Sequence, residues 1–162
     1  MNNVLILMGS DSDWNIMKKA ADTLKEFSVP YEAHVSSAHR TPEKTMTLVR
    51  DFSGACIIVG AGAAAHLGGV VAAHTVKPVI AVPLNATALH GLDALLATVQ
   101  MPSGIPVATM AIDGAKNAAL FALSILAVSD EKLRSRLEEY RRTMTDEVEA
   151  KDQKLQQLLR GA

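Results

Sequence analysis

The stretch Val4-Leu5-Ile6-Leu7-Met8-Gly9-Ser10-Asp11-Ser12-Asp13 decides the fold of this chain. An apolar run that stops at a glycine and is followed by serine and aspartate indicates a buried strand, a loop and the start of a helix. Further apolar runs alternate with segments of helical period, which is the pattern of repeated βαβ units around a parallel sheet. The expected strands are Val4 to Met8, Tyr31 to Val35, Ala55 to Gly60, Pro78 to Val82 and Pro106 to Ile112.

The segments between these strands have apolar residues at the spacing of an α-helix. The apolar residues from Trp14 to Phe27 recur every three or four positions, so they share one face of a helix. A second helix is expected to begin at Thr41-Pro42-Glu43, where threonine caps, proline suits the first helical position and the acid favours the positive helix end. Ala64 to Thr75 and Ala115 to Val128 are nearly free of charge, so they must be covered on more than one side. These helices are covered either by another subunit or by the core of their own domain, and the sequence favours neither alternative.

The composition changes at Ser129. From there the chain is rich in charged residues around regularly spaced leucines, which predicts an amphipathic C-terminal helix that packs on its own domain or on another subunit. With 162 residues the chain has the size of one domain. We therefore expect a single domain over 1–162, with an α/β core at about 4–128 and a helical extension at 129–162.

Charge and composition restrict the partners. The net charge is −1, whereas a nucleic acid or an anionic membrane would require a basic face, so we expect a small-molecule substrate. Without a signal-peptide pattern or an apolar stretch of about 18 residues, the protein is expected to be cytoplasmic. Cys56 lies in an apolar run and is expected to be buried and unreactive. The histidines lack the spacing of a zinc site, so no metal is expected.

Polar loops follow the first strands. The carboxyl ends of parallel strands share one edge of the sheet, where ligands bind in α/β proteins. The first loop offers Gly9 for close backbone approach, the hydroxyls of Ser10 and Ser12, and a free helix amino end, all of which suit a phosphate or a ribose. Asp13 suits ribose hydroxyls better, since a carboxylate repels phosphate. The alternative is that Ser10, Ser12 and Asp13 only cap a helix.

The pair His39-Arg40 follows the second strand. Arginine presents a planar, permanently charged fork that suits phosphate, and histidine both accepts and donates a proton near neutral pH. We expect Arg40 to bind a phosphate and His39 to transfer a proton. The alternative for His39 is a loop imidazole bonded to the backbone. His66 lies where the third loop enters a helix and is expected to line the same crevice.

Four ordered motifs carry a family resemblance. Together they closely resemble the N5-carboxyaminoimidazole ribonucleotide mutases, the PurE family of purine biosynthesis. The motifs are Met8-Gly9-Ser10-Asp11-Ser12-Asp13-Trp14, Ser37-Ala38-His39-Arg40-Thr41-Pro42, Gly60-Ala61-Gly62 with Ala64-Ala65-His66-Leu67, and Val99-Gln100-Met101-Pro102-Ser103-Gly104-Ile105-Pro106-Val107.

The resemblance implies a fold and a reaction. The implied fold is a flavodoxin-like three-layer α/β/α sandwich with a five-stranded parallel sheet, assembled as an octamer and requiring no cofactor. The implied reaction moves a carboxylate from the exocyclic nitrogen of aminoimidazole ribonucleotide to ring carbon C4. The second and third motifs resemble the class I mutases rather than the class II carboxylases, which take free carbon dioxide.

The resemblance also implies roles for individual residues. His39 transfers the proton, and the substrate is held at its two ends by residues of the first three loops. Ser10, Asp13 and Arg40 bind the ribose phosphate, Ser37, Ala38, Gly62 and His66 line the imidazole end, and Gly9, Ser12 and Leu67 complete the expected substrate-binding set. Two alternatives remain: a carboxylase that takes aminoimidazole ribonucleotide and free carbon dioxide, and a non-catalytic nucleotide-binding module with the same phosphate loop.

Overall fold

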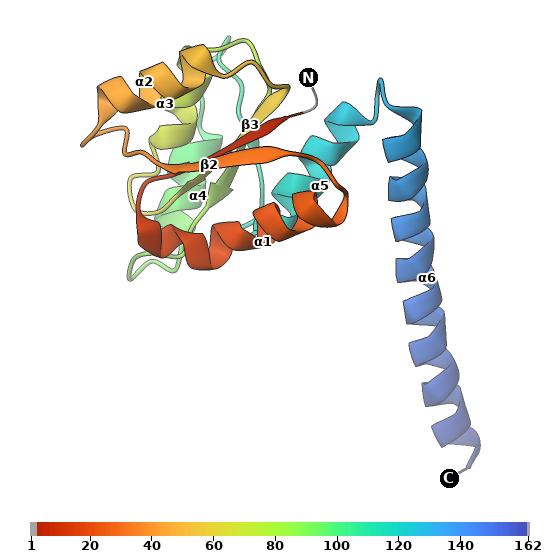
Figure 1. The fold of residues 1–162 in the computed structure, drawn as a ribbon. Helices are drawn as coiled ribbons and strands as arrows, with labels where there is room; N and C mark the ends of the chain where they lie inside the picture. Colours follow the sequence, from red (N-terminus) through yellow and green to blue (C-terminus); the bar gives the residue numbers. More distant parts are fainter. Residues whose placement is uncertain (1–2, 162) are drawn as a thin grey trace. The chain divides into compact units, whose positions relative to one another are not determined.

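The first part of the chain folds around a five-stranded parallel sheet with strand order β2-β1-β3-β4-β5 (Figure 1). The structure is a computed structural model that describes residues 3–161. The strands are β1 (Val4–Met8), β2 (Tyr31–Val35), β3 (Cys56–Ala61), β4 (Val79–Pro83) and β5 (Ala108–Thr109). This order is that of flavodoxin, so the expected flavodoxin-like fold is confirmed.

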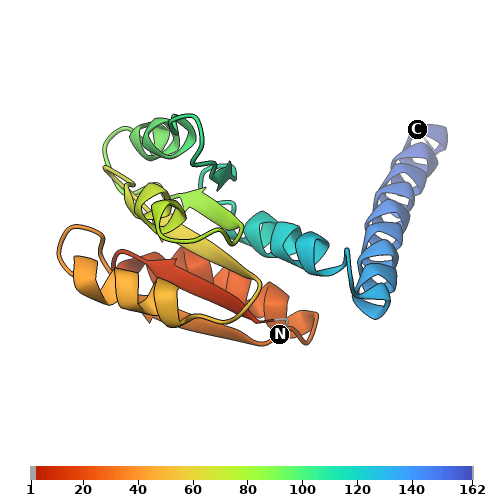
Figure 2. The ribbon, with the colours of Figure 1, turned by 90° about the horizontal axis from the view of Figure 1, so that it is seen from above.

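Helices cover both faces of this sheet. Figures 1 and 2 show α2 and α3 on one face and α1 with the first part of α5 on the other. The helical segments are the 3-10 turn η1 (Asp11–Asp13), α1 (Trp14–Glu26), α2 (Pro42–Asp51), α3 (Leu67–Ala73), α4 (Leu92–Val99), α5 (Ala115–Leu126) and α6 (Glu131–Arg160). The three layers confirm the expected α/β/α sandwich.

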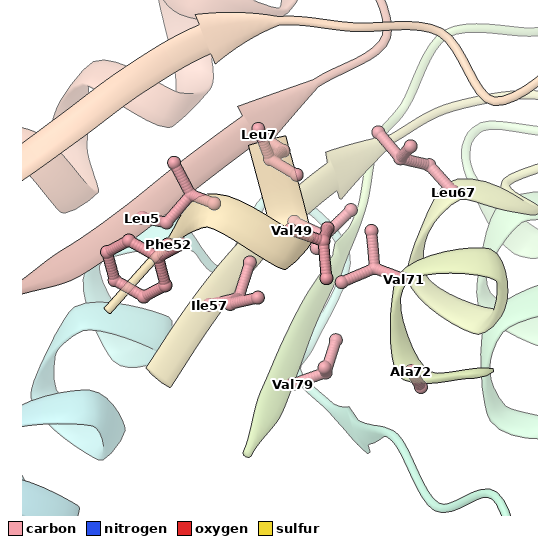
Figure 3. Packing of buried hydrophobic residues seen from close by; sticks show 10 residues of the cluster. Leu5, Leu7, Val49, Phe52, Ile57, Leu67, Val71, Ala72 and Val79 are labelled. Atoms are coloured by element: carbon pink, nitrogen blue, oxygen red, sulfur yellow. The ribbon is translucent and has the colours of Figure 1, made fainter. Parts of the chain in front are cut away.

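The core is filled by aliphatic side chains from the central strands. All five residues of β1 are buried, so alternate side chains enter the layers on both faces. Figure 3 shows Leu5 and Leu7 beside Val49 of α2 and Val71 of α3. On the opposite face, a Cβ at Gly60 of β3 would lie 2.4 Å from the sulfur of Met17, so glycine is what lets α1 approach the sheet. Each buried large aliphatic side chain contributes roughly 1.5–3 kcal/mol.

The register of the sheet brings the first three loops together. Met8, the last residue of β1, pairs with Val35 of β2 and with Gly60 of β3. The three strands therefore end within one residue of the same level, and the loops that follow them leave from one edge. This is the edge at which the sequence places its polar side chains.

The largest differences from the expected bounds are at the third helix and the fifth strand, whereas β3 and β4 each begin and end one residue later than expected. The third helix begins at Leu67 rather than Ala64, because Ala63 and Ala65 have φ values of 48° and 46° and cannot continue a helix. The fifth strand is confined to Ala108–Thr109; Pro106 has no N–H to donate to the ladder, which is consistent with the later start. Helix α4 was not expected, because it has only eight residues and most of them are apolar, so the segment does not stand out from the apolar runs around it.

The chain divides into two compact units, Met1–Leu123 and Ser124–Ala162. In the second unit, α6 is continuous over 30 residues, and the Asp130 side chain caps it by accepting a hydrogen bond from the Leu133 backbone N–H at 3.0 Å. The expected C-terminal amphipathic helix is thus present. The single-domain organisation with a boundary near residue 128 stays a prediction. No helix within residues 3–161 combines the length and the apolar character needed to cross a membrane.

The Cys56 thiol gives a first test of the core. Its side chain is fully buried at the start of β3, and burial raises the pKa of the thiol to about 11, since the thiolate loses its water. We expect a thiol reagent at pH 8 to label Cys56 only after denaturant unfolds the chain. Rapid stoichiometric labelling of the folded protein would contradict the buried position.

Candidate functional site

One pocket of about 390 Å³ lies at the carboxyl edge of the sheet. Every residue that the sequence analysis placed in the substrate site lines it. These are Gly9, Ser10, Ser12, Asp13, Ser37, Ala38, His39, Arg40, Gly62, His66 and Leu67. The wall is completed by Ala61, Ala63, Ala64, Ala65 and Ala86, to which no role in the site was assigned from the sequence, because a methyl side chain has no reactive group.

The first loop is organised by hydrogen bonds among its own polar groups. The Ser10 backbone N–H donates to Oδ2 of Asp13 at 2.9 Å, and the Ser12 N–H donates to Oδ1 of Asp11 at 3.0 Å. The Ser12 hydroxyl lies 3.0 Å from the Ser10 hydroxyl. Ser10 and Asp13 therefore do cap the turn that leads into α1, as the alternative interpretation held, and they also face the pocket.

The second loop is held between β2 and α2. The Ser36 backbone N–H donates to the Met8 carbonyl at 2.8 Å, which joins this loop to the end of β1. The Ser36 hydroxyl is buried and lies 2.7 Å from the Thr45 hydroxyl. The Thr41 hydroxyl accepts from the Ser37 N–H at 2.9 Å and lies 3.1 Å from the Ser37 carbonyl. The loop that carries His39 and Arg40 is thus fixed at both ends.

Arg40 connects the first two loops. Its Nη2 donates to the Gly9 carbonyl at 2.9 Å, and its Nε donates to the Ser37 hydroxyl at 3.4 Å. Arg40 is otherwise exposed and lines the pocket together with Ser10 and Ser12. A guanidinium in this position combines a permanent positive charge with fixed donors, which is the arrangement that recognises a phosphate.

His39 and His66 meet across the pocket. Nε2 of His39 lies 2.9 Å from Nδ1 of His66, and the ring centroids are 5.0 Å apart with planes at 87°. The sequence predicts both residues at the crevice but does not indicate their contact, because they are 27 residues apart and belong to different loops. The three other histidines, His34, His74 and His90, do not line this pocket.

Backbone geometry shapes the third loop. Ala63 and Ala65 both adopt the left-handed region, which non-glycine residues rarely occupy and which concentrates at functional sites. The Ala65 N–H donates to the Gly62 carbonyl at 3.0 Å and closes a tight turn. This turn brings His66, the residue that precedes α3, to the pocket wall.

Gly62 is required by a close contact and gives a second test. A Cβ at this position would lie 2.4 Å from the Cβ of Ala86, closer than real Cβ atoms approach one another. Gly62→Ala must therefore displace the third loop, and we expect a roughly tenfold loss of kcat/KM in any reaction at this pocket. The double variant Gly62→Ala/Ala86→Gly removes the clash and should recover most of the loss.

Gly161→Ala provides the control for that test, because Gly161 does not line the pocket. A Cβ at Gly161 would lie 3.6 Å from the Gln157 carbonyl, an ordinary van der Waals contact. Its kcat/KM should stay native. A Gly62→Ala variant with native kcat/KM, or a double variant with no recovery, would show that the Ala86 contact does not shape the pocket.

The electrostatics of Asp13 differ from those of an exposed carboxyl. Burial raises its pKa above the ordinary value; hydrogen bonds from the Ser10 and Gly9 backbone act against this, the Asp11 charge adds to it and the Arg40 charge opposes it. Ionisation is therefore less favourable in the fold than in the unfolded chain. The resulting contribution to stability is fully present below the unfolded pKa and is lost as the pH rises through the folded pKa.

Asp13→Asn tests this sign. An amide keeps an acceptor for the Ser10 N–H but carries no charge, so we expect a slightly higher Tm than native at neutral pH. The difference should shrink as the pH falls below the unfolded pKa of about 3.9, where the native carboxyl becomes protonated in both states. Thermal melts at a series of pH values check this, and a lower Tm of the variant throughout the range would contradict the direction.

The pocket therefore combines a positively charged arginine, hydroxyl groups and a pair of imidazoles. Such a set can hold a phosphorylated sugar at one end and move a proton at the other. Among residues 3–161, no group of three histidine, cysteine or acidic side chains could hold a metal ion. The expectation that the protein uses no metal or cofactor stays a prediction.

Comparison with known proteins identifies the family. The AIR carboxylase family matches residues 3–147. The N5-carboxyaminoimidazole ribonucleotide mutase of Pyrococcus horikoshii is 52% identical over 156 residues, covering 94% of this chain and 88% of that protein. The mutase of Methanocaldococcus jannaschii is 52% identical over 157 residues, covering 97% and 99%. The crystal structure of Treponema denticola PurE superimposes with a TM-score of 0.87 and 30% identity, covering 94% and 98%. With its motifs, its fold and its sequence in agreement, the chain belongs to the AIR carboxylase family, the PurE family that its four motifs resemble.

Proposed function

We propose that this protein is an N5-carboxyaminoimidazole ribonucleotide mutase of purine biosynthesis, which isomerises its substrate to 4-carboxy-5-aminoimidazole ribonucleotide. The observation that carries the proposal is the shared pocket of His39, Arg40 and the Ser10–Asp13 loop. These residues supply a proton-transferring group and a phosphate site in one cavity. Relatives that share half of the sequence over nearly the whole chain bear this name.

The substrate is held at its two ends. Arg40 and the Ser10 hydroxyl bind the phosphate, and Asp13 accepts hydrogen bonds from ribose hydroxyls. Ser37, Ala38, Gly62 and His66 then line the imidazole ring, which lies next to the His39 side chain. Anchoring the phosphate fixes the ring relative to His39, so that proton transfer occurs within one complex.

The chemistry requires one mobile proton. Carbon dioxide leaves the exocyclic nitrogen and its bonding electrons stay on that nitrogen, which makes ring carbon C4 nucleophilic. C4 attacks the same carbon dioxide, so C4 carries both hydrogen and carboxylate and the exocyclic nitrogen becomes an imine. Neutral His39 removes the C4 proton and delivers it to this nitrogen, which restores the aromatic ring and the amine. Enclosure keeps the carbon dioxide at high effective concentration until C4 attacks.

A direct assay tests the activity. Purified protein is incubated with N5-carboxyaminoimidazole ribonucleotide without ATP or added metal, and the C-carboxylated isomer is quantified by chromatography. A second reaction contains aminoimidazole ribonucleotide and bicarbonate. We expect fast conversion in the first reaction. Conversion only in the second would identify a carboxylase that uses free carbon dioxide, and binding without conversion in either would identify a nucleotide-binding module.

We further propose that the protein works in the cytoplasm as a homo-oligomer, with the octamer implied by its motifs as the assembly. Helix α4 supports an interface, because Leu92, Leu96 and Val99 recur at helical spacing and are each at least half exposed in the single chain. Light scattering coupled to size-exclusion chromatography should give the mass of eight chains. A monomer at micromolar concentration would contradict the assembly.

A further inference from the structure

His66 contacts the His39 ring at Nε2, so Nδ1 of His39 makes no contact with His66. Nε2 of His39 lies 2.9 Å from Nδ1 of His66. We propose that His66 is a positioning residue, which accepts a hydrogen bond from Nε2–H of His39 and so makes Nδ1 of His39 the atom that takes and returns the proton. This proposal rests on the proposed function and adds the group that prepares His39 for it.

The positions of the protons on the two neutral rings determine which nitrogen of His39 can act as a base. Two neutral imidazoles can share this contact only if one nitrogen donates and the other accepts. If Nε2 of His39 donates, its Nδ1 is bare and acts as a base, and His66 carries its own proton on Nε2. If Nδ1 of His66 donates instead, Nδ1 of His39 holds a proton and cannot accept the one on C4. Only the first arrangement gives the neutral base that the isomerisation requires.

No carboxylate fills this role. Within residues 3–161, the His39 ring makes its single hydrogen bond to His66. The nearest charged groups of the pocket are engaged elsewhere, since Asp13 accepts from the Ser10 backbone and Arg40 donates to Gly9 and Ser37. An efficient base is usually oriented by a third group, and here that group is a second imidazole.

The contact also favours the transition state. When Nδ1 of His39 takes the C4 proton, the ring becomes an imidazolium and its Nε2–H becomes a stronger donor. The lone pair on Nδ1 of His66 then accepts a charge-assisted hydrogen bond, which is stronger than the neutral one before transfer. The proton goes on from Nδ1 to the exocyclic nitrogen, and both imidazoles return to their starting state. Interactions that strengthen only on the way to the transition state raise kcat rather than lower KM.

The backbone supports a fixed position for His66. It lies directly after Ala65, whose φ of 46° is unfavourable for alanine, and directly before α3. The His66 carbonyl also accepts the Val70 N–H at 3.0 Å, which ties it to the first turn of that helix. A residue held in this way presents its side chain in one direction, as a positioning group must.

Nuclear magnetic resonance of the unliganded protein tests the tautomer without turnover. The 15N shifts of the His39 ring, recorded where the ring is neutral, distinguish a protonated from a bare nitrogen. We expect a proton on Nε2 and a bare Nδ1 in the native protein, and a mixture of tautomers in His66→Leu. A proton on Nδ1 of native His39, or an unchanged tautomer in His66→Leu, would overturn the proposal. Since no substrate is present, this result is independent of whether the protein proves to be a mutase.

Steady-state kinetics test the consequence. We expect His66→Leu to lower kcat roughly 10- to 100-fold, the usual effect of losing a hydrogen bond to a charged group, while KM changes less than about threefold. His66→Asn places an amide oxygen close to the position of Nδ1 and should recover most of kcat. His74→Leu is the matched control, because His74 lies at the other end of α3, outside the pocket, and bonds to the Val70 carbonyl.

A merely structural role predicts a different pattern. In that case His66→Leu would raise KM or lower Tm along with kcat, and His66→Asn would give no recovery. Native kcat in His66→Leu would likewise overturn the proposal. Circular dichroism melts of the three variants separate a loss of folding from a loss of catalysis.

Discussion

His39→Asn is expected to lower kcat for the isomerisation by roughly a hundred- to ten-thousandfold, the range that general acid–base catalysis contributes. An amide is similar in size to an imidazole and keeps polar atoms near Nδ1, but it cannot bind and release a proton near neutral pH. The carboxylate can still leave and C4 can still attack, yet the C4 proton then has no acceptor. Stopped and continuous assays of product formation measure the loss.

Binding by the same variant separates catalysis from recognition. The phosphate is held by Arg40 and the first loop, so we expect the Kd of the product for His39→Asn to stay within about threefold of native. His74→Asn, which changes a histidine outside the pocket, should keep native kcat. A His39→Asn variant that retains native kcat would remove His39 from the mechanism, and a large loss of affinity would reassign it to binding.

Arg40→Met should have the second largest effect, a rise in KM of roughly a hundredfold or more, since charge-assisted hydrogen bonds to phosphate are lost together with the positive charge. Methionine retains much of the length and apolar stem of arginine. It also removes the bond from Nη2 to the Gly9 carbonyl, which joins the first two loops. Arg40→Lys keeps the charge without the planar fork and should fall between native and Arg40→Met.

A substrate without the phosphate provides the sharpest control. The corresponding nucleoside is expected to bind native protein and Arg40→Met with similar weak affinity, because the difference between them lies in the phosphate contact. Arg50→Met on α2, where Arg50 is exposed and pairs with Asp51 at 3.3 Å, should leave KM unchanged. If the nucleoside loses as much affinity as the nucleotide, Arg40 acts through loop structure and does not bind phosphate.

The elements that sequence predicted well are those with a strong local signal. β1 is an unbroken apolar run between turn residues, and its bounds agree with expectation. α2 begins at Pro42 after Thr41, as expected, although the Thr41 hydroxyl bonds to Ser37 and does not cap the helix. The start of α3 could not be foreseen, because nothing in the local sequence marks Ala63 and Ala65 as left-handed. That geometry is imposed by the packing of the third loop.

In the site, too, residues with a clear chemical signal could be predicted from the sequence, and features that depend on packing could not. His39, Arg40, Ser10 and Asp13 have reactive or charged groups and follow predicted strands, so topology was enough to place them at one edge. The alanine wall, including Ala86, could not be predicted, since small apolar residues have no recognisable chemistry. The 2.9 Å contact between His39 and His66 depends on how two loops meet, which spacing along the chain does not reveal.

The isotopic origin of the product carboxylate distinguishes a mutase from a carboxylase. N5-carboxyaminoimidazole ribonucleotide carrying 13C in its carboxylate is converted in excess unlabelled bicarbonate, and the product is analysed by mass spectrometry at low conversion. We predict that the product keeps the label, because a mutase pocket retains the released carbon dioxide until C4 attacks it. A product without label, formed at a rate that follows the bicarbonate concentration, would contradict it and would identify a carboxylase that draws on free carbon dioxide.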